Sequence, residues 1–251
     1  MIEEDVEIET PDGSCDGFLY WDDDGRPRPG VIHLTDIAGI RASHHEMAKR
    51  LAAAGYCVLL PNVFYRSGRP PLFDFTPTPG DERTTKRFAE LAKPLEPQAM
   101  ERDAAAYVDF LAGQESVARG AIGVVGYCFT GAMAMRTAAV RPERVAAVAS
   151  FHGGGLFTDA PTSPHLALPR IRARLYIGHA SKDRSMPEEA IVKLDHALGA
   201  WGGKYESEVY TAFHGWTVPD SPVYDRVEGD RAFTKLTQLF AATLRSRARD
   251  R

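Results

Sequence analysis

The chain contains 251 residues, of which 44% are hydrophobic and 25% are charged, and its formal net charge is −4 at pH 7. A chain of this length and composition can form one soluble α/β domain with a substantial core. The slightly negative charge excludes a broad basic surface, so no nucleic-acid partner is expected.

The three cysteines are widely spaced and include no C-x-x-C pair, which argues against a disulfide framework or a zinc site. The first residues are acidic, and no apolar run reaches the roughly 18 residues of a membrane span. We therefore expect no signal peptide and no membrane partner. A reducing cytoplasm is the predicted location, and residues 245–251 are interpreted as a basic, solvated helix end.

The first predicted element is a β-hairpin, in which residues 6–9 and 17–21 pair across the turn Pro11-Asp12-Gly13. Apolar and β-branched runs then alternate five times with segments of helical periodicity. Further strands are expected at 31–34, 56–60, 121–125, 145–151, 175–180 and 205–210. Helices are expected at 43–54, 81–91, 99–111, 129–140, 187–198 and 230–244. This order predicts an α/β fold, with one mostly parallel sheet covered by helices on both faces, in a single domain over residues 1–251.

Two helix starts and one loop carry further signals. Ser43 and Glu46 fit a capping box at the start of the first helix, and Pro187 fits the first position of the fifth. Residues 62–80 contain several prolines and aromatic residues with little periodicity. A loop of that length inside a compact domain is usually functional or mobile.

The most informative stretch of the sequence is Val124-Val125-Gly126-Tyr127-Cys128-Phe129-Thr130-Gly131. A β-branched run, a glycine turn and the start of a helix form the context of a nucleophile elbow of the G-x-S-x-G kind, with cysteine in place of serine. The positive end of a helix dipole lowers the pKa of a thiol at that position. Cys128 could instead be a buried small hydrophobic residue, but such a residue does not need a strained, exposed corner.

Three further positions follow the carboxyl ends of predicted strands, where sites of parallel sheets gather. His214 is placed to act as the base for Cys128, and Asp183 to orient the imidazole. The chain order of nucleophile, acid and base is that of the α/β-hydrolase plan. The oxyanion hole is predicted from the backbone N–H groups of Phe129 and Ile37.

These residues resemble the dienelactone hydrolase (carboxymethylenebutenolidase) family of the α/β-hydrolase fold. The matching residues are Gly126-Tyr127-Cys128, Asp36-Ile37 with Gly39, Ala54-Gly55-Tyr56 leading to Pro61, Asp81-Glu82-Arg83, Lys182-Asp183 and His214. The resemblance covers about residues 5–244 and implies a Cys-His-Asp triad of Cys128, His214 and Asp183. It also implies an acidic side chain before the oxyanion amide, which is Asp36 here and is often Glu in the family.

Other positions depart from the family pattern. The members that act on dienelactone hold the substrate carboxylate with two arginines, and the corresponding positions here are Thr85, between Arg83 and Arg87, and Val218. Loss of both arginines removes bidentate recognition of a carboxylate. Thr130 stands where the family often has glycine, and we expect it to alter the packing behind the elbow.

The substrate is expected to contact Asp36, Tyr65, Arg83, Tyr127 and Trp216. The aromatic residues Phe64, Phe73 and Phe75, with Tyr65 and Trp216, favour an apolar and neutral substrate, although packing of loop 62–80 over the core explains them equally well. No cofactor and no metal is predicted. The protein is expected to be a monomer or a homodimer.

Hydrolysis of a small ester or lactone through a thioester on Cys128 is the leading interpretation. Two alternatives remain open at the level of sequence. One is a thiol-dependent acyltransferase or thioesterase, and the other is a noncatalytic scaffold that binds a small ligand. A redox switch at Cys128 is less consistent with the sequence, since no resolving cysteine lies near it.

Overall fold

The computed structural model describes residues 1–244, so the predicted basic helix end at 245–251 lies outside the described residues. Its centre is an eight-stranded sheet in the order β1-β2-β4-β3-β5-β6-β7-β8. The strands are β1 (Ile2–Thr10), β2 (Gly13–Trp21), β3 (Gly30–Leu34), β4 (Cys57–Pro61), β5 (Ile122–Tyr127), β6 (Val145–Phe151), β7 (Arg174–Lys182) and β8 (Tyr205–Phe213). The hairpin β1–β2 and the pair β2–β4 are antiparallel, and the remaining pairs are parallel.

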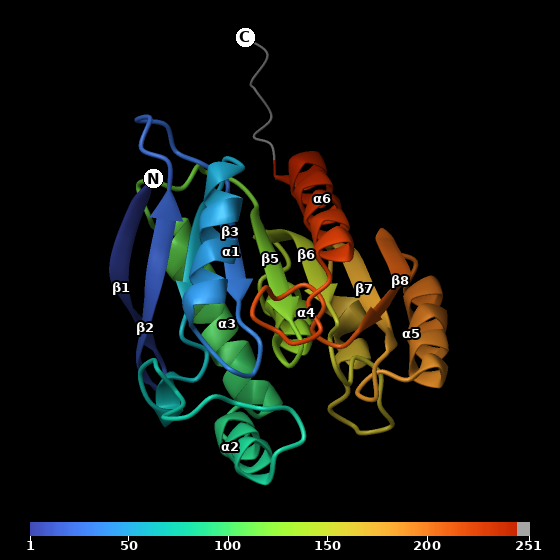
Figure 1. Cartoon of the computed structure of the whole chain (residues 1–251). Helices are drawn as coiled ribbons and strands as arrows, with labels where there is room; N and C mark the ends of the chain where they lie inside the picture. The colour runs from blue at the N-terminus through green and yellow to red at the C-terminus, as the bar shows by residue number, and fades with distance from the viewer. Residues whose placement is uncertain (245–251) are drawn as a thin grey trace.

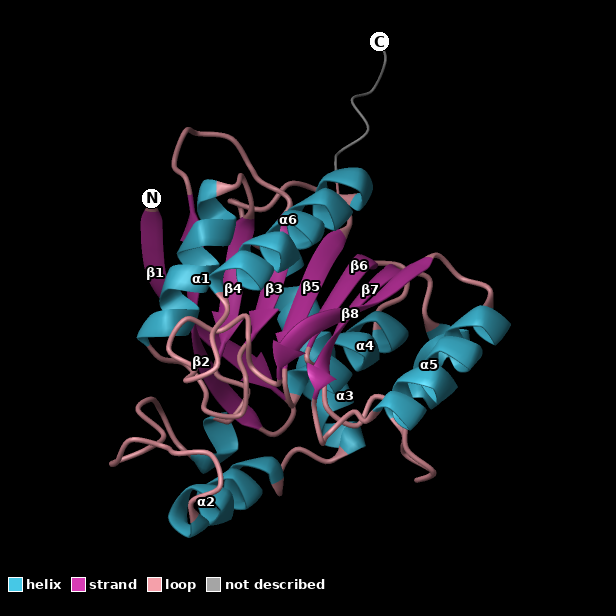
Figure 2. Cartoon of the chain, turned by 45° about the vertical axis from the view of Figure 1, so that its right-hand side comes forward, coloured by secondary structure: helices cyan, strands magenta, loops and turns pink. Residues whose placement is uncertain are grey.

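The helices cover both faces of this sheet. They are α1 (Ala42–Ala53), α2 (Glu82–Ala92), α3 (Pro97–Ala112), α4 (Thr130–Val140), α5 (Glu188–Trp201) and α6 (Arg226–Thr243), with 3-10 turns η1 (Tyr65–Ser67) and η2 (Pro164–Arg170). Helices α1 and α6 lie on one face, and α3, α4 and α5 lie on the other (Figure 2). Helix α2 lies beyond the end of the sheet toward which β3 points (Figure 1).

The core is divided between the two faces because the central strands are buried on both sides. Ile32, Val124 and Val148 pack under α3 and α4, whereas Val31 and Val125 pack under α1 and α6. Successive residues of one strand, such as Val31 and Ile32, are therefore both apolar and face opposite layers of helices. This is expected for strands of a parallel sheet that is covered on both faces. The predicted α/β architecture and the N-terminal hairpin are therefore confirmed.

The predicted elements are all present, with differences at their ends. The capping box at Ser43 is wrong, because α1 begins at Ala42 and its N-cap residue is Arg41. Pro187 is the N-cap of α5 rather than its first residue. The last helix begins four residues before the predicted start, where the Asp225 side chain accepts a hydrogen bond from the backbone N–H of Glu228.

The parallel strands bring the predicted chemical groups to one edge of the sheet. Strand β5 ends at Tyr127, directly before Cys128, and β7 ends at Lys182, directly before Asp183. Strand β8 ends at Phe213, directly before His214. Within residues 1–244, no helix combines the length and apolar character needed to cross a bilayer.

Gly126 is the position where the fold constrains the sequence of the elbow most directly. A Cβ atom added there would lie 2.4 Å from the carbonyl oxygen of Thr130 and 3.1 Å from Cβ of Ala134. We therefore predict that Gly126→Ala lowers the free energy of unfolding by about 3 kcal/mol, since the backbone of α4 must shift. Urea denaturation measures this change.

Gly199→Ala in α5 is the matched control. Its added Cβ would meet only the Tyr205 hydroxyl, at 3.7 Å. Removing a helical glycine is expected to stabilise the protein by about 0.5 to 1 kcal/mol. Equal effects of the two substitutions would show that the elbow does not depend on close packing at Gly126.

Candidate active site

Cys128 occupies a sharp corner between β5 and α4. Its φ is 55°, and within residues 1–244 the only other non-glycine residue with positive φ is His152. The backbone N–H of Cys128 lies 3.1 Å from both the carbonyl oxygen of Phe151 and Nδ1 of His152. Its carbonyl oxygen accepts hydrogen bonds from the N–H groups of Gly131 and Gly154. Left-handed backbone of this kind concentrates at functional sites, and here it leaves the thiol partly exposed.

The structure brings the thiol, an imidazole and a carboxylate into one line. Sγ of Cys128 lies 3.0 Å from Nε2 of His214, and Nδ1 of His214 lies 2.6 Å from Oδ2 of Asp183. The other oxygen of Asp183 accepts from the backbone N–H and the hydroxyl of Ser185, at 2.8 and 2.6 Å. The Asp183 side chain is only 2% exposed, so these donors fix its orientation.

The surroundings of His214 and Asp183 favour their charged forms. Burial alone lowers the pKa of His214, but its contacts with Asp183 and Cys128 outweigh burial and raise it to about 10. Burial raises the pKa of Asp183, but hydrogen bonds from His214 and Ser185 outweigh burial and lower it. The pair therefore resembles an ionised carboxylate that orients an imidazolium beside sulfur.

His152 is a residue of this site that the sequence interpretation missed. It is 1% exposed, and its ring centroid lies 5.1 Å from that of His214. Burial and, to a smaller extent, the charge of His214 lower the pKa of His152 to about 3, so the ring is neutral. Since Nδ1 accepts from the Cys128 N–H, Nε2 carries the proton and donates to the Thr217 hydroxyl, at 2.8 Å. The signal in the sequence was a histidine at the end of the strand beside the elbow strand.

The backbone amides of Ile37 and Phe129 have no hydrogen-bond acceptor within residues 1–244. Phe129 precedes the first residue of α4, where N–H groups lack intrahelical partners. Ile37 follows Asp36 in the loop after β3, and its side chain packs against the core. These are the two amides that the sequence assigns to an oxyanion hole, and they remain available to an acceptor.

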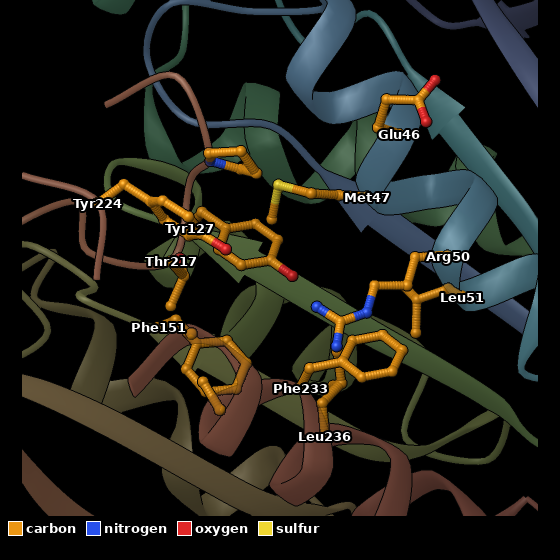
Figure 3. A pocket seen from close by; sticks show the side chains of 13 residues that line it. Glu46, Met47, Arg50, Leu51, Tyr127, Phe151, Thr217, Tyr224, Phe233 and Leu236 are labelled. Carbon is orange, nitrogen blue, oxygen red and sulfur yellow. The ribbon is translucent and has the colours of Figure 1, made fainter. Parts of the chain in front are cut away.

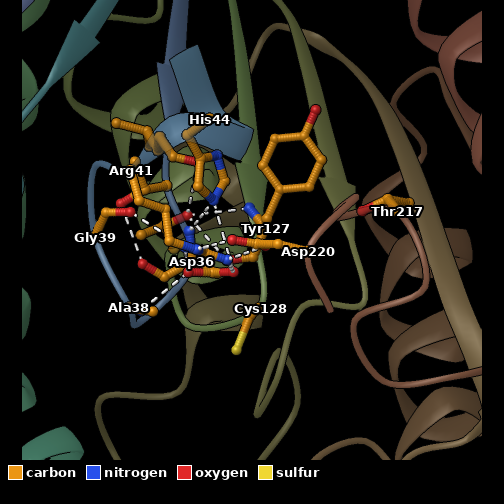
Figure 4. A network of polar contacts seen from close by, with 12 residues as sticks. Asp36, Ala38, Gly39, Arg41, His44, Tyr127, Cys128, Thr217 and Asp220 are labelled. Atoms are coloured by element: carbon orange, nitrogen blue, oxygen red, sulfur yellow. Dashed lines mark hydrogen bonds and ion pairs between the residues drawn. The ribbon is translucent and has the colours of Figure 1, made fainter. Parts of the chain in front are cut away.

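Asp36 does not present its carboxylate to the thiol. Arg41 donates to both carboxylate oxygens, at 2.7 and 2.8 Å, and His44 Nε2 lies 3.6 Å away. The same guanidinium donates to both oxygens of Asp220, at 2.7 and 2.9 Å (Figure 4). Burial raises the pKa of the Asp36 carboxyl, but His44 and Arg41 outweigh burial and hold that pKa well below its usual range. Arg41 thus joins the loop that carries Ile37 to the loop that follows His214.

A shallow depression surrounds His214 and Asp183. Its apolar lining comes from Pro79, Phe213, Pro222 and Val223. Lys182 and Arg184 add two exposed cationic side chains. Within residues 1–244, no cluster of three His, Cys, Asp or Glu side chains has the arrangement needed to hold a metal ion.

Two of the residues expected to contact substrate lie elsewhere. The Tyr65 hydroxyl is hydrogen-bonded to Thr10 and to Asp103, near the N-terminal hairpin. Arg83 is exposed on α2, where it pairs with Asp74 and lies over the ring of Phe75. Neither lines the depression around His214, because each is held by its own polar partners.

Two further expected contacts are buried behind the thiol. Trp216 is fully buried, with its ring against Tyr210 and His152, so it supports the site without facing it. Tyr127 is 4% exposed and stacks on Phe151. The aromatic residues of loop 62–80 also pack inward: Phe64 is 1% exposed, and Phe73 contacts other aromatic rings. The structure thus favours packing over substrate contact for this aromatic set.

Comparison with known proteins identifies the group of enzymes to which this site belongs. The model of the dienelactone hydrolase family matches residues 15–244. The chain belongs to the dienelactone hydrolase family. A carboxymethylenebutenolidase from Rhodococcus opacus is 27% identical over 219 residues, covering 85% of this chain and 81% of the relative. A carboxymethylenebutenolidase from Pseudomonas putida is 26% identical over 171 residues, covering 68% of this chain and 70% of the relative.

Solved structures show the same α/β-hydrolase fold. A dienelactone hydrolase from Anabaena variabilis superposes with a TM-score of 0.69 at 18% identity, covering 97% of this chain and 99% of that structure. A dienelactone hydrolase-like promiscuous phosphotriesterase from metagenomic libraries gives a TM-score of 0.79 at 23% identity, with 96% and 98% covered. At these identities the likeness establishes the fold.

The structure shows the surroundings of the three positions at which the sequence suggests departures from the family pattern. Thr85 is exposed on α2 and donates to the carbonyl oxygen of Asp81, and Val218 is 1% exposed. Thr130 ties the elbow together, because its hydroxyl oxygen accepts from the Tyr127 N–H at 3.0 Å and lies 3.3 Å from the carbonyl oxygen of Leu34. The Thr130 hydroxyl thus affects the region behind the elbow mainly through hydrogen bonds, and not through added bulk as packing alone would suggest.

The link through Arg41 generates a prediction about stability. Arg41→Gln leaves the Asp36 carboxylate, whose side chain is 14% exposed, without its cationic partner. We expect the free energy of unfolding at pH 7 to fall by about 2 to 3 kcal/mol, as measured in urea. Because the folded-state pKa of Asp36 is lowered, this loss is full at pH 7 and shrinks as the pH falls below about 4.

Arg50→Gln is the control for that experiment. Its pair with Asp230 is half exposed on both sides, with side chains 48% and 50% accessible. An exposed pair contributes less than about 1 kcal/mol. Similar losses in the two variants would contradict a special role for the Arg41 link.

The raised pKa of His214 generates a second prediction. A histidine whose pKa rises on folding contributes stability that is full below its unfolded value of 6.5 and is lost as the pH rises through its folded value of about 10. His214→Gln should therefore destabilise the protein most below pH 6.5 and least above about pH 10. Urea denaturation across this range measures the trend. A flat profile for His214→Gln across this range would contradict the charged pair.

Proposed function

We propose that this chain hydrolyses small carboxylic esters or lactones, with Cys128 as nucleophile, His214 as base and Asp183 as the group that orients His214. The observation that carries the proposal is the hydrogen-bonded line from Sγ through the imidazole to the buried carboxylate, at 3.0 and 2.6 Å. Membership of the dienelactone hydrolase family supports hydrolysis of an ester or lactone. A reducing cytoplasm would keep the thiol free.

The acylation half of the reaction follows from this geometry. Nε2 of His214 takes the thiol proton, and Sγ of Cys128 attacks the substrate carbonyl carbon. The carbonyl oxygen becomes an oxyanion that accepts hydrogen bonds from the amides of Ile37 and Phe129, which have no other acceptor in the described chain. The carbon–oxygen bond then breaks, and the imidazolium returns its proton to the leaving alkoxide. A thioester remains on Cys128.

Deacylation uses the same groups in the same positions. Nε2 of His214 accepts a proton from a water molecule, and the hydroxide attacks the thioester carbon. The second oxyanion collapses, the carbon–sulfur bond breaks, and the carboxylic acid leaves as the thiol is restored. Asp183 stays ionised throughout and holds the imidazole by its Nδ1–H.

The substrate that fits is small, with an apolar acyl or alcohol part. The depression around His214 is lined mainly by Pro79, Phe213 and Val223. The resemblance matches the two carboxylate-binding arginines of the family to Thr85 and Val218, which cannot form an ion pair. Lys182 and Arg184 are exposed, so they attract an anion more than they orient it.

The test compares the wild type with Cys128→Ala on small esters and lactones, with and without a free carboxylate. We expect turnover of neutral members and a loss of at least about 10³-fold in kcat/KM for the variant. Acyl transfer to an added alcohol in preference to water would identify an acyltransferase instead. A wild type that turns over no ester but binds one would indicate a noncatalytic scaffold.

Iodoacetamide labelling tests the nucleophile without a substrate. Cys15 and Cys57 are fully buried, and burial raises their pKa to about 12 and about 11, so they should react slowly. Peptide mass spectrometry should find Cys128 labelled first, and His214→Gln should slow that labelling. Equal labelling of the three cysteines would contradict an activated thiol.

A further inference from the structure

A second cavity lies between α1 and α6, behind the elbow (Figure 3). Its volume is about 120 Å³, and it shares no lining residue with the depression around His214. Met47, Leu51, Phe151 and Leu236 supply much of its apolar wall. A closed apolar cavity of about 150 Å³ is known to hold a benzene ring. This cavity is smaller but opens to solvent beside the exposed Arg50, so it admits an apolar body of at most about six carbons.

One polar group in this cavity lacks a partner. Tyr127 is 4% exposed, and within residues 1–244 no hydrogen bond joins its hydroxyl to another protein group. The hydroxyl points into the cavity, toward the guanidinium of Arg50 (Figure 3). Burial raises the pKa of Tyr127, so the group stays protonated and offers an O–H donor. The hydroxyl oxygen is not among the buried side-chain atoms of the described chain that lack a partner, so it is accessible from the cavity and can donate to a molecule bound there.

Arg50 places a positive charge at the mouth of the cavity. Its guanidinium lies 3.8 Å over the ring of Phe233, and one nitrogen donates to Asp230 at 2.8 Å. A guanidinium has five N–H donors, so this single bond leaves others for a ligand. The acidic residue on the rim, Glu46, is paired with Lys49 at 3.7 Å, which offsets its charge.

We propose that this cavity is a binding site for a small monocarboxylate with an apolar body of about six carbons, for which benzoate is the simplest aromatic probe. The carboxylate accepts hydrogen bonds from the Tyr127 hydroxyl and the Arg50 guanidinium. The ring packs against Met47, Phe151 and Leu236. A neutral analogue of the same shape, such as benzamide, lacks the charge that Arg50 recognises and binds more weakly.

The occupant would contact groups that hold the nucleophile. Tyr127 directly precedes Cys128. Thr217 also lines the cavity, and its hydroxyl accepts from His152, whose other nitrogen accepts the Cys128 N–H. Binding is therefore expected to change the rate at which iodoacetamide labels Cys128. Binding at this cavity does not require turnover, so a binding measurement tests this proposal independently of the proposed hydrolysis.

Calorimetric titration with benzoate tests the site on the full-length protein. We expect one molecule bound per chain and weaker binding of benzamide. Tyr127→Phe removes only the hydroxyl and should weaken benzoate binding by about tenfold, the scale of one hydrogen bond to a charged group. Tyr205→Phe, which removes a hydroxyl on β8 at the far edge of the sheet, should leave binding unchanged.

Two further measurements locate the bound molecule. Ala232→Leu adds bulk to the wall of the cavity and should abolish binding, with folding checked by circular dichroism. Protein already alkylated at Cys128 should still bind benzoate. The proposal is overturned if benzoate does not bind at millimolar concentration. It is also overturned if Tyr127→Phe binds as tightly as wild type, or if alkylation alone removes binding.

Discussion

The left-handed backbone of Cys128 is the constraint on which the rest of the site depends. Such a conformation costs on the order of 1 to 3 kcal/mol for a residue with a side chain. It persists because hydrogen bonds hold the residue on both sides. The N–H of Cys128 donates to Phe151 and His152, and its carbonyl oxygen accepts from Gly131 and Gly154. Those partners belong to the end of β6 and to the start of α4, so two neighbouring elements fix one corner. The result is a thiol that leaves the sheet edge and reaches His214.

A second constraint joins the loops on either side of that thiol. Arg41 uses its planar guanidinium to hold Asp36 and Asp220 at once, and each contact is bidentate. Asp36 lies next to the amide of Ile37, and Asp220 lies six positions after His214. The separation between His214 and the Ile37 amide is thereby fixed by Asp36, Arg41 and Asp220, none of which is hydrogen-bonded to the thiol. This also explains why Asp36 is unavailable as a substrate contact.

The sequence predicted the sheet and the line of Cys128, Asp183 and His214 because these depend on local patterns. Strand periodicity, a glycine turn and strand ends are visible in short windows, and topology brings the strand ends together. His152 and Arg41 were missed because their roles depend on contacts between distant segments, such as Arg41 with Asp220, 179 residues apart. Tyr65 and Trp216 were misplaced for a related reason. An aromatic residue that lies near a site in the sequence can pack into the core as readily as face the site. Here Trp216 packs into the core, and Tyr65 is held by Thr10 and Asp103.

The packing of the loop after β8 explains why position 218 carries no charged side chain. Val218 is buried beside Thr217, whose hydroxyl is bonded to His152, so an arginine at 218 would need a buried acidic partner. Val218 is instead an apolar residue that packs beside the residue supporting His152 and the elbow. Lys182 and Arg184 leave positive charge near His214, but exposed flexible cations are screened by salt and impose little orientation. On the function we propose, selection among esters therefore depends more on the shape of the apolar lining around His214 than on charge.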